Sequence, residues 1–576
     1  MSGGTPVRHR RRLRDRLPVR LRHHWKPAAA LGVGLAAMVY FLGDARISPY
    51  VTSSSRVEAD AITDNVHGTV DLYDTSAKHS IQLTYQQTDF DKMMKEFKED
   101  GTKDYIEADL TIDGVYLNDV GIRLKGNSTL SSLRGSKGMP GGGRDLPEGA
   151  RGAPAGGAPG GAAGNAGGEG GAGKGKAAGG MRAVGGMGGM AQYDLSARKP
   201  EELPWLVKID EYVEGRAYQG EREISLRPGS NGQVPVNEAL SLSLTEESGQ
   251  KAERYAFTEV KVNNRPTVTR LMVEAPDTDY ADDVADGNGV LYKARANGSF
   301  DYKGDDPTDY EKSFEQLNKK GSQDLEPVMK LIKWVNKASD EEFARDLHKY
   351  VDVDSLATYL AAQNLLLNFD DMAGPGKNYL LWYDLDTKKF SVLGWDYNLT
   401  FSGDATAGPD DSIGMGGGMP GGMGGAGKGG AGTGGTQQRL PDALPSGMPE
   451  GMPEGMPSGM PGGMMPGGAV GGGQDGGGGD AKPKPGGGQG GGFMQHALKT
   501  KFLDSDAFDG VYKKAYRELY EKFYGSGTAE KRLTDIVEQA RRAGADSKEL
   551  DTAVTKLRKT VTERSAALAK NSEVTG

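Results

Sequence analysis

Four polar side chains lie at the edges of apolar runs between residues 367 and 401 and could carry chemistry. They are Asp370, Asp371, Asn378 and Asp396. A buried carboxylate is costly unless a cation or a hydrogen-bond donor meets it. The segments NYLLWYDL and KFSVLGW predict two short strands with a turn at Asp386-Thr387, which would bring Asp370, Asn378 and Asp396 to one end of a hairpin.

Oxygen ligands in this arrangement suit a hard divalent cation. Phosphoryl transfer needs such a metal to neutralise phosphate charge, together with a carboxylate that orients or deprotonates the attacking hydroxyl. Aspartate and asparagine also begin turns, so the spacing alone fits a purely structural role equally well.

The elements that must position these residues change in type along the chain. Alternating apolar and polar residues predict strands from Ser80, Tyr105, Pro204, Arg222, Phe257 and Thr269. Helical spacing appears in DKMMKEFKED and VNEALSLSLTEES, then dominates after Glu311 and again from Phe493 to Leu568. We therefore expect an α+β fold with a strand-rich N-terminal lobe (57–134 and 195–310) and a helical C-terminal lobe (311–404 and 493–570).

Two segments have almost no branched or aromatic residues and are expected to be disordered inserts: 135–194, rich in glycine, and 405–492, rich in glycine, methionine and proline. Thioethers in the second segment could in principle bind soft copper ions, but a flexible spacer is the expected role. The 576 residues include 89 glycines, 28 prolines and no cysteine, which excludes disulfides and thiolate chemistry. A net charge of −9 argues against nucleic-acid binding.

The N-terminus predicts a membrane location. The basic segment 1–26 precedes an uncharged apolar run at 27–43, about 17 residues and near the lower limit for a membrane span. The positive-inside rule keeps the arginines cytoplasmic and sends the rest of the chain across the membrane. A cleaved signal peptide is the alternative, although no A-x-A-like site follows the run.

Several motifs in order resemble the CotH family, the spore coat protein H-like atypical protein kinases. They are GIRLKGNSTL, VNEALSL, LMVEA and the segment from NFDD to GWDYNLTF. The resemblance implies a two-lobed protein-kinase-like fold, ATP with Mg or Mn as cofactors, and phosphorylation of serine or threonine in surface or coat proteins.

The resemblance also implies roles for the four polar residues. Asp370 corresponds to the catalytic carboxylate of the family, with the adjacent Asp371 as the fallback, while Asn378 and Asp396 correspond to the metal ligands. Asn398 stands where the family often has a second aspartate, so one acidic ligand is missing.

The nucleotide-binding residues follow from the same resemblance. Lys208 in a predicted strand and Glu238 at a helix start have the order of the lysine and glutamate that pair in kinases to hold phosphates. A surface lysine and a helix-start glutamate are the plain alternative. Gly126, with Arg123 or Lys125, resembles a phosphate-side turn.

Glu274, in the segment LMVEA, resembles the connection between the lobes near the adenine, although core packing explains that strand equally well. We expect a membrane-anchored kinase whose C-terminal domain is extracytoplasmic and which acts on protein substrates. The alternative is a non-catalytic kinase-like module that binds surface or coat polymers, which the scarcity of ATP outside the membrane favours.

Overall fold

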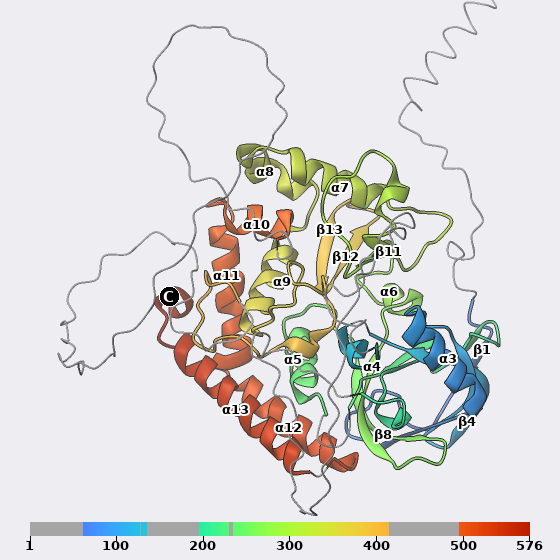
Figure 1. Ribbon diagram of the computed structural model, residues 1–576. Coiled ribbons are helices and arrows are strands. Elements are labelled where there is room, and N and C mark those ends of the chain that lie inside the picture. The colour runs from blue at the N-terminus through green and yellow to red at the C-terminus, as the bar shows by residue number, and fades with distance from the viewer. Residues whose placement is uncertain (1–60, 127, 135–194, 230–233, 414–494, 546) are drawn as a thin grey trace, which may run out of the picture.

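The computed structural model describes residues 61–126, 128–134, 195–229, 234–413, 495–545 and 547–576 (Figure 1). The predicted basic segment 1–26, the predicted span 27–43 and most of both predicted inserts lie outside these residues. Within the described residues, no helix combines the length and apolar character needed to cross a membrane.

The first part of the described chain is a closed barrel with strand order β2-β3-β4-β5-β7-β9-β8. Its strands are β2 (His79–Tyr85), β3 (Ile106–Ile112), β4 (Val115–Leu124), β5 (Trp205–Lys208), β7 (Glu223–Leu226), β8 (Tyr255–Val262) and β9 (Val268–Glu274). Neighbouring strands are antiparallel except for β2 and β8, which are parallel. Alternate residues of β2 are buried, as the period-two pattern predicts.

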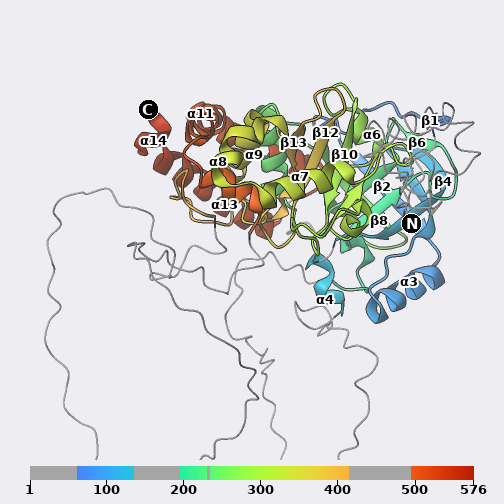
Figure 2. The same ribbon diagram turned by 90° about the horizontal axis from the view of Figure 1, so that it is seen from above.

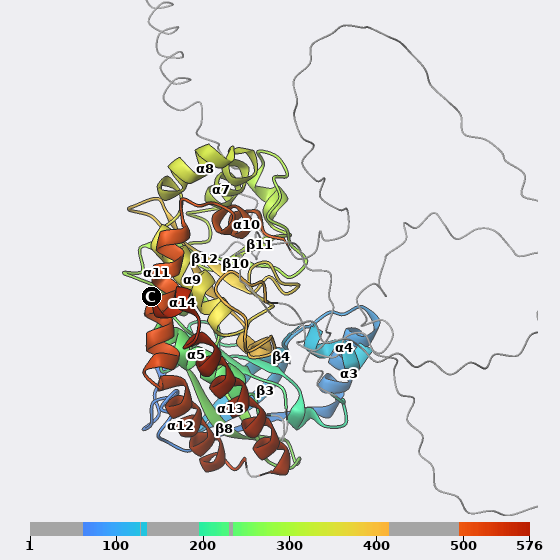
Figure 3. The ribbon, with the colours of Figure 1, turned by 90° about the vertical axis from the view of Figure 1, so that its left-hand side faces the viewer.

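Short elements complete the barrel. A parallel pair, β1 (Asp64–Val66) and β6 (Arg216–Tyr218), lies at its edge. The helix α3 (Gln87–Glu99) buries an apolar face formed by Phe90, Met93, Met94 and Phe97, and α4 (Ser131–Arg134) lies beside it (Figure 3). The one-turn helices η3 (Ser128–Leu130) and η5 (Pro200–Glu202) lie in the connections.

A second, four-stranded sheet has the order β11-β10-β12-β13. Its strands are β10 (Gly289–Ala294), β11 (Phe314–Gln316), β12 (Tyr379–Asp384) and β13 (Phe390–Gly394). It lies between the barrel and the C-terminal helices (Figures 1 and 2). The predicted hairpin is confirmed as β12 and β13. Its strand β12 also pairs with β10, which lies within the range expected for the N-terminal lobe, so the sheet joins residues from both expected lobes.

Helices cover this sheet and extend along one side of the barrel. They are α5 (Val236–Glu247), α6 (Thr278–Asp282), η6 (Pro307–Tyr310), α7 (Glu326–Lys337), α8 (Asp340–Asp346), η7 (Leu347–Lys349), α9 (Val353–Leu365), η8 (Tyr397–Leu399), α10 (Ala497–Leu503), α11 (Asp509–Tyr520), the π-helix η9 (Glu521–Gly525), α12 (Thr528–Arg542), α13 (Lys548–Leu568) and α14 (Ser572–Thr575). The buried helix α9 packs against α11, and α12 packs against α5 and β8.

The prediction of disorder from residue 405 onward is wrong for residues 405–413. Arg564 of α13, fully buried, donates hydrogen bonds to the carbonyls of Ala405 and Ala407, and the Tyr512 hydroxyl donates to the carbonyl of Pro409. These contacts use backbone oxygens, which composition cannot reveal. The α+β class is confirmed, whereas the kinase-like arrangement stays a prediction.

Candidate functional site

Asp370 lies in the loop that joins α9 to β12. The chain leaves α9 through Leu367, which has a positive φ of 51°. The Asn368 side chain then accepts a hydrogen bond from the Asp370 backbone (3.1 Å) and donates one to Gln363 on α9 (2.7 Å). This loop therefore has a fixed conformation set by buried amide hydrogen bonds.

The Asp370 carboxylate is 6% exposed and accepts hydrogen bonds from the Gly376 amide (2.5 Å) and from Asn378 Nδ2 (3.0 Å). A Cβ at Gly376 would lie 2.6 Å from Asp370 Oδ2, and a Cβ at Gly374 would lie 2.4 Å from its Cα. Both glycines are therefore needed for the loop to close around this carboxylate. Burial raises the pKa of Asp370 to about 6, against the opposing effect of the Gly376 amide and with a further rise from Asp396.

Asp371 has a different environment. Its carboxylate forms a salt bridge with Lys499 of α10 and accepts a hydrogen bond from the Ala373 amide (2.8 Å). A carboxylate that is already bound to an internal lysine is poorly placed to accept a proton from a substrate. Between the two adjacent acids, the contacts favour Asp370 as the reactive group and Asp371 as a structural one.

Asn378 and Asp396 meet at one end of the β12–β13 hairpin, as predicted, because Tyr379 pairs with Gly394. Asn378 Nδ2 lies 3.4 Å from the Asp396 carbonyl. Asp396 has a left-handed backbone (φ 56°), and its buried Oδ1 accepts no hydrogen bond in the described structure.

This unsatisfied oxygen is a position where a cation would be stabilised. Within the described residues, no three histidine, aspartate or glutamate side chains gather as a metal site. A metal here would therefore take its remaining ligands from water and from substrate phosphates, as Mg²⁺ commonly does. The residues present fit that type of site.

The predicted pairing of Lys208 with Glu238 is wrong in this structure. Lys208 Nζ lies 2.9 Å from Glu211 and 4.0 Å from Asp210, on the outside of the barrel. Glu238, 1% exposed, instead meets Arg227, whose Nη2 is 2.5 Å from Glu238 and 3.6 Å from Asp396 Oδ1. Lys208 pairs with Asp210 and Glu211, which are close to it in the sequence, and this local pairing explains why it does not reach Glu238 on α5.

Three cationic side chains surround the indole ring of Trp395. The Nζ atoms of Lys293 and Lys125 lie 3.9 and 5.2 Å from the ring centroid, and Arg227 Cζ lies 5.7 Å from it. Burial, together with Arg227 and Lys293, lowers the pKa of Lys125 well below its ordinary value, and burial also lowers the pKa of Lys293. Three converging cations beside Asp396 form a site that favours a multiply charged anion.

We define Lys125, Arg227 and Lys293 as the cation cluster. Its member Arg227 forms a buried ion pair with Glu238. Burial raises the pKa of Glu238, Arg227 opposes the rise, and Asp396 adds to it. The pair therefore holds the guanidinium between a fixed carboxylate and the unsatisfied oxygen of Asp396.

The other predicted nucleotide residues have separate contacts. Arg123 lies over the Tyr105 ring (5.1 Å), and the Gly126 carbonyl accepts a hydrogen bond from Lys103 (2.5 Å). Glu274, 1% exposed, binds Arg254 through its Nε (3.2 Å), Nη2 (2.6 Å) and backbone amide (2.9 Å). The Glu274 carboxylate thus has a structural ion-pair role, and of the predicted phosphate-side turn only Lys125 joins the cation cluster.

A cavity of about 420 Å³ opens beside the loop that joins α9 to β12. Asp371 and Lys499 line it, together with the described segment 409–413 and residues of α10 and α11. It is a space through which another molecule could approach the loop.

Sequence inspection missed Arg227, Lys293, Trp395 and Lys499. Arg227 directly follows β7, which was a predicted strand, whereas Lys293 lies in β10, a strand that the sequence analysis did not predict although the segment VLYKA alternates in polarity. Their convergence on one tryptophan involves β7, β10 and β13, and no local pattern encodes contacts between strands so distant in sequence.

Comparisons with known proteins show what this region is similar to. Residues 191–429 match the family model described as CotH kinase protein. The inner spore coat protein H of Bacillus subtilis (strain 168) is 26% identical over 200 residues, which is 34% of this chain and 54% of that protein. The chain thus spans about half the length of the curated relative that it matches.

Proposed function

We propose that the protein, whose residues 191–429 match the CotH kinase family model, is an ATP-dependent kinase that phosphorylates serine or threonine of surface or coat proteins. The proposal includes a two-lobed kinase-like arrangement, with the barrel as one lobe and the second sheet with its helices as the other. It also includes a membrane anchor at 27–43 that holds the described domain outside the cytoplasm.

The observation that carries the proposal is that two acids and the cation cluster lie close together. One acid is Asp370, a buried carboxylate with a raised pKa, and the other is Asp396, whose Oδ1 accepts no hydrogen bond in the described structure. Asp370, Asn378 and Asp396 are linked by hydrogen bonds of 3.0 and 3.4 Å. The cation cluster reaches this group through Arg227, 3.6 Å from Asp396. Phosphoryl transfer requires these two kinds of site side by side, a metal-binding acid and positive charge for the phosphates.

The residues have distinct roles in this proposal. Asp396 and Asn378 would hold a divalent cation, which supplies charge neutralisation for the phosphates when it is bound. Lys125, Arg227 and Lys293 bind phosphate oxygens, and Glu238 holds Arg227 in position. Asp370 orients the acceptor hydroxyl and takes its proton late in transfer.

The test compares three isosteric variants of the full chain. Asp396→Asn should abolish stabilisation by ATP with Mg²⁺ or Mn²⁺, whereas Asp370→Asn should retain that stabilisation and lose phosphate transfer by about 10²- to 10⁴-fold. Asp371→Asn should retain measurable transfer and lower thermal stability, because Lys499 loses its partner. Thermal unfolding with and without ATP and metal, together with transfer of labelled phosphate to protein, measures both effects.

Two outcomes would change the assignment. A dead Asp371→Asn protein beside an active Asp370→Asn protein would exchange the roles of the two acids and keep the kinase. If the wild type neither binds ATP nor transfers phosphate with either metal, the enzyme proposal fails and a polymer-binding role takes its place.

A further inference from the structure

Gln363 of α9 adjoins both acids of the proposed phosphotransfer site through one neighbour on each side. Its side chain is 2% exposed, and its Oε1 accepts a hydrogen bond from Asn368 Nδ2 (2.7 Å) in the loop that carries Asp370. Its Nε2 lies 3.2 Å from the position that a Cβ on Gly394 would take. Gly394 ends β13, two residues before Asp396. One buried glutamine therefore lies between the two segments that hold the acids.

The direction of the hydrogen bonds at this glutamine is fixed from Asp370 outward. The Asp370 backbone amide can only donate, so Asn368 presents its Oδ1 to that amide (3.1 Å) and its Nδ2 to Gln363. Gln363 must then present its oxygen to Asn368. Its Nε2 donor faces away from the loop and needs an acceptor elsewhere.

The Tyr397 hydroxyl lies where that acceptor is needed. A Cβ on Gly394 would lie 1.7 Å from the Tyr397 oxygen as well as close to Gln363 Nε2, so only a glycine leaves room for both groups. Burial and the nearby Glu253 raise the pKa of Tyr397, while the polar groups of Thr245 on α5 and of Gln363 oppose the rise. Gln363 and Tyr397 are therefore neighbours.

This contact is close but incomplete. In the described structure, neither Gln363 Nε2 nor the Tyr397 hydroxyl, both buried, forms a hydrogen bond of normal geometry. An unpaired buried donor and an unpaired buried acceptor each cost free energy, which favours closing the contact between them. Hydrogen bonds of active sites are often poorly aligned before the ligand binds and tighten in the complex.

Tyr397 is in turn connected to Asp396 and to α5. It directly follows Asp396, and its carbonyl accepts a hydrogen bond from the Thr400 hydroxyl (2.8 Å). Ser241 of α5 donates to that same hydroxyl (2.8 Å). The segment after Asp396 is thus held by α5, the helix that carries Glu238, and a shift of Tyr397 would shift Asp396 with it.

We propose that Gln363 is a positioning residue that fixes Asp370 relative to Asp396, through Asn368 on one side and Tyr397 on the other. This inference rests on the proposed kinase activity. Gln363 contacts neither ATP nor the acceptor in this role, and it acts only by holding the two acids in place. A misplacement of about 1 Å can reduce a rate roughly a hundredfold, so breaking this connection should reduce kcat at least tenfold.

Gln363→Met breaks both contacts with a side chain of similar size. In the full chain, kcat for phosphate transfer should fall at least tenfold and KM for ATP should change less than about threefold, because Asp396, Asn378 and the cation cluster still bind metal-ATP. Tyr397→Phe removes only the hydroxyl and should lower kcat less. The double variant should be no worse than Gln363→Met alone, since residues that act as a unit are not additive.

Gln363→Glu is the conservative variant. Its carboxylate still accepts from Asn368, and when protonated it also offers a donor to Tyr397. Its kcat should therefore exceed that of Gln363→Met, and the ratio of its kcat to that of wild type should rise as the pH falls. A residue that only fills space would show no such dependence.

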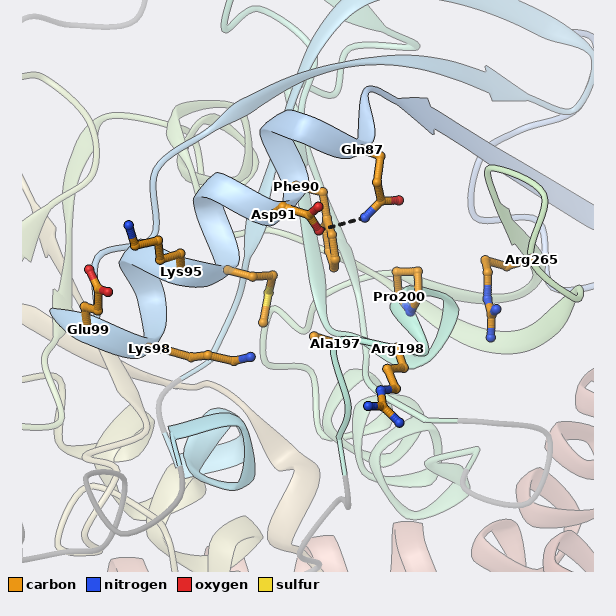
Figure 4. A pocket seen from close by; sticks show the side chains of 11 residues that line it. Gln87, Phe90, Asp91, Lys95, Lys98, Glu99, Ala197, Arg198, Pro200 and Arg265 are labelled. Atoms are coloured by element: carbon orange, nitrogen blue, oxygen red, sulfur yellow. Dashed lines mark hydrogen bonds between the residues drawn. The ribbon is translucent and has the colours of Figure 1, made fainter.

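Two other glutamines provide matched controls. Gln316 on β11 donates to the carbonyls of Asn318, Lys319 and Gln323, so Gln316→Met also removes buried hydrogen bonds. Gln87 on α3 donates to Asp91 and lines a cavity of about 660 Å³ that includes no residue of the proposed site (Figure 4). Both variants should keep kcat within about twofold of wild type, whatever stability they lose.

Hydrogen exchange separates this proposal from the kinase proposal. The amides of Asp370 and Gly376 donate within the loop, so Gln363→Met should exchange faster than wild type over residues 368–378, and Gln316→Met should not. If wild type transfers no phosphate, the kinase proposal fails, and exchange still decides whether Gln363 fixes the loop. Unchanged exchange in Gln363→Met, or a kcat that matches that of Gln316→Met, would overturn the assignment of Gln363.

Discussion

Replacing Arg227 with methionine tests the least expected contact of the site, its buried ion pair with Glu238. The side chain of Arg227 is 9% exposed and that of Glu238 is 1% exposed, and their atoms are 2.5 Å apart. Removing one partner of a buried ion pair typically costs about 3–5 kcal/mol, because the other charge remains buried without compensation. We expect a value in this range, since Asp396 also loses its neighbouring cation.

Lys208→Met is the matched control. Lys208 is 31% exposed and pairs with Glu211, which is 26% exposed, so solvent screens their interaction. Exposed pairs contribute about 0–1 kcal/mol. The two variants remove the same charge from neighbouring barrel strands, and their free energies of unfolding should differ by about 3 kcal/mol.

Urea denaturation monitored by tryptophan fluorescence measures these values, and a double-mutant cycle adds the coupling between positions. Arg227→Met combined with Glu238→Gln should show a coupling energy on the order of 2 kcal/mol, whereas Lys208→Met combined with Glu238→Gln should show almost none. A large coupling of Lys208 to Glu238, with none for Arg227, would refute the assignment and restore the pairing expected from the sequence. Isothermal titration should also show loss of ATP binding in Arg227→Met and its retention in Lys208→Met.

Three further predictions concern a titrating group, a buried cation and a glycine. Burial opposes protonation of His79, but its hydrogen bonds to Asp113 (2.7 Å) and to a backbone carbonyl outweigh burial and raise its pKa. The stability that wild type has over His79→Gln should therefore be largest below about pH 6.5 and decrease as the pH rises through the raised value, which thermal unfolding across pH measures. Arg564→Met should cost about 3 kcal/mol in urea denaturation, because a fully buried guanidinium ties the segment after the site to α9 and α13; a cost under about 1 kcal/mol would contradict this. Gly376→Ala should reduce phosphate transfer at least tenfold, because the new Cβ would lie 2.6 Å from a carboxylate oxygen of the site; Gly510→Ala, in open space on α11, should not, and equal activity of the two would argue against a close-fitting loop.

The elements of this protein follow from local sequence patterns. Alternation predicted β2 and β8, helical spacing predicted α3 and α9, and the hairpin was expected at the correct residues. The hairpin also placed Asn378 and Asp396 at the same end, since strand register fixes which residues are opposite each other. These properties depend on residues close in the sequence, and so the sequence contains them.

Tertiary contacts decided between the two adjacent acids, Asp370 and Asp371, and between the two cations that could pair with Glu238. Asp371 is bound by Lys499, 128 positions away in the chain, which leaves Asp370 as the candidate base. Lys208 ends β5 and Arg227 directly follows β7, and the resemblance to the family favoured Lys208 as the partner of Glu238. The structure selects Arg227, whose Nη2 lies 2.5 Å from the Glu238 carboxylate.

The sequence by itself determined the α+β class, most of the barrel strands, the hairpin, and the acids and amide at the end of that hairpin, but it did not reveal β1, β6, β10 or β11. Only the tertiary structure decided which cations lie beside those acids. It also decided that Glu274 pairs with Arg254, and that Arg564 donates hydrogen bonds to the segment 405–413. The physical reason is that secondary structure arises from periodicity and turns within a few residues, whereas the partner of a buried charge depends on which distant segments pack around it.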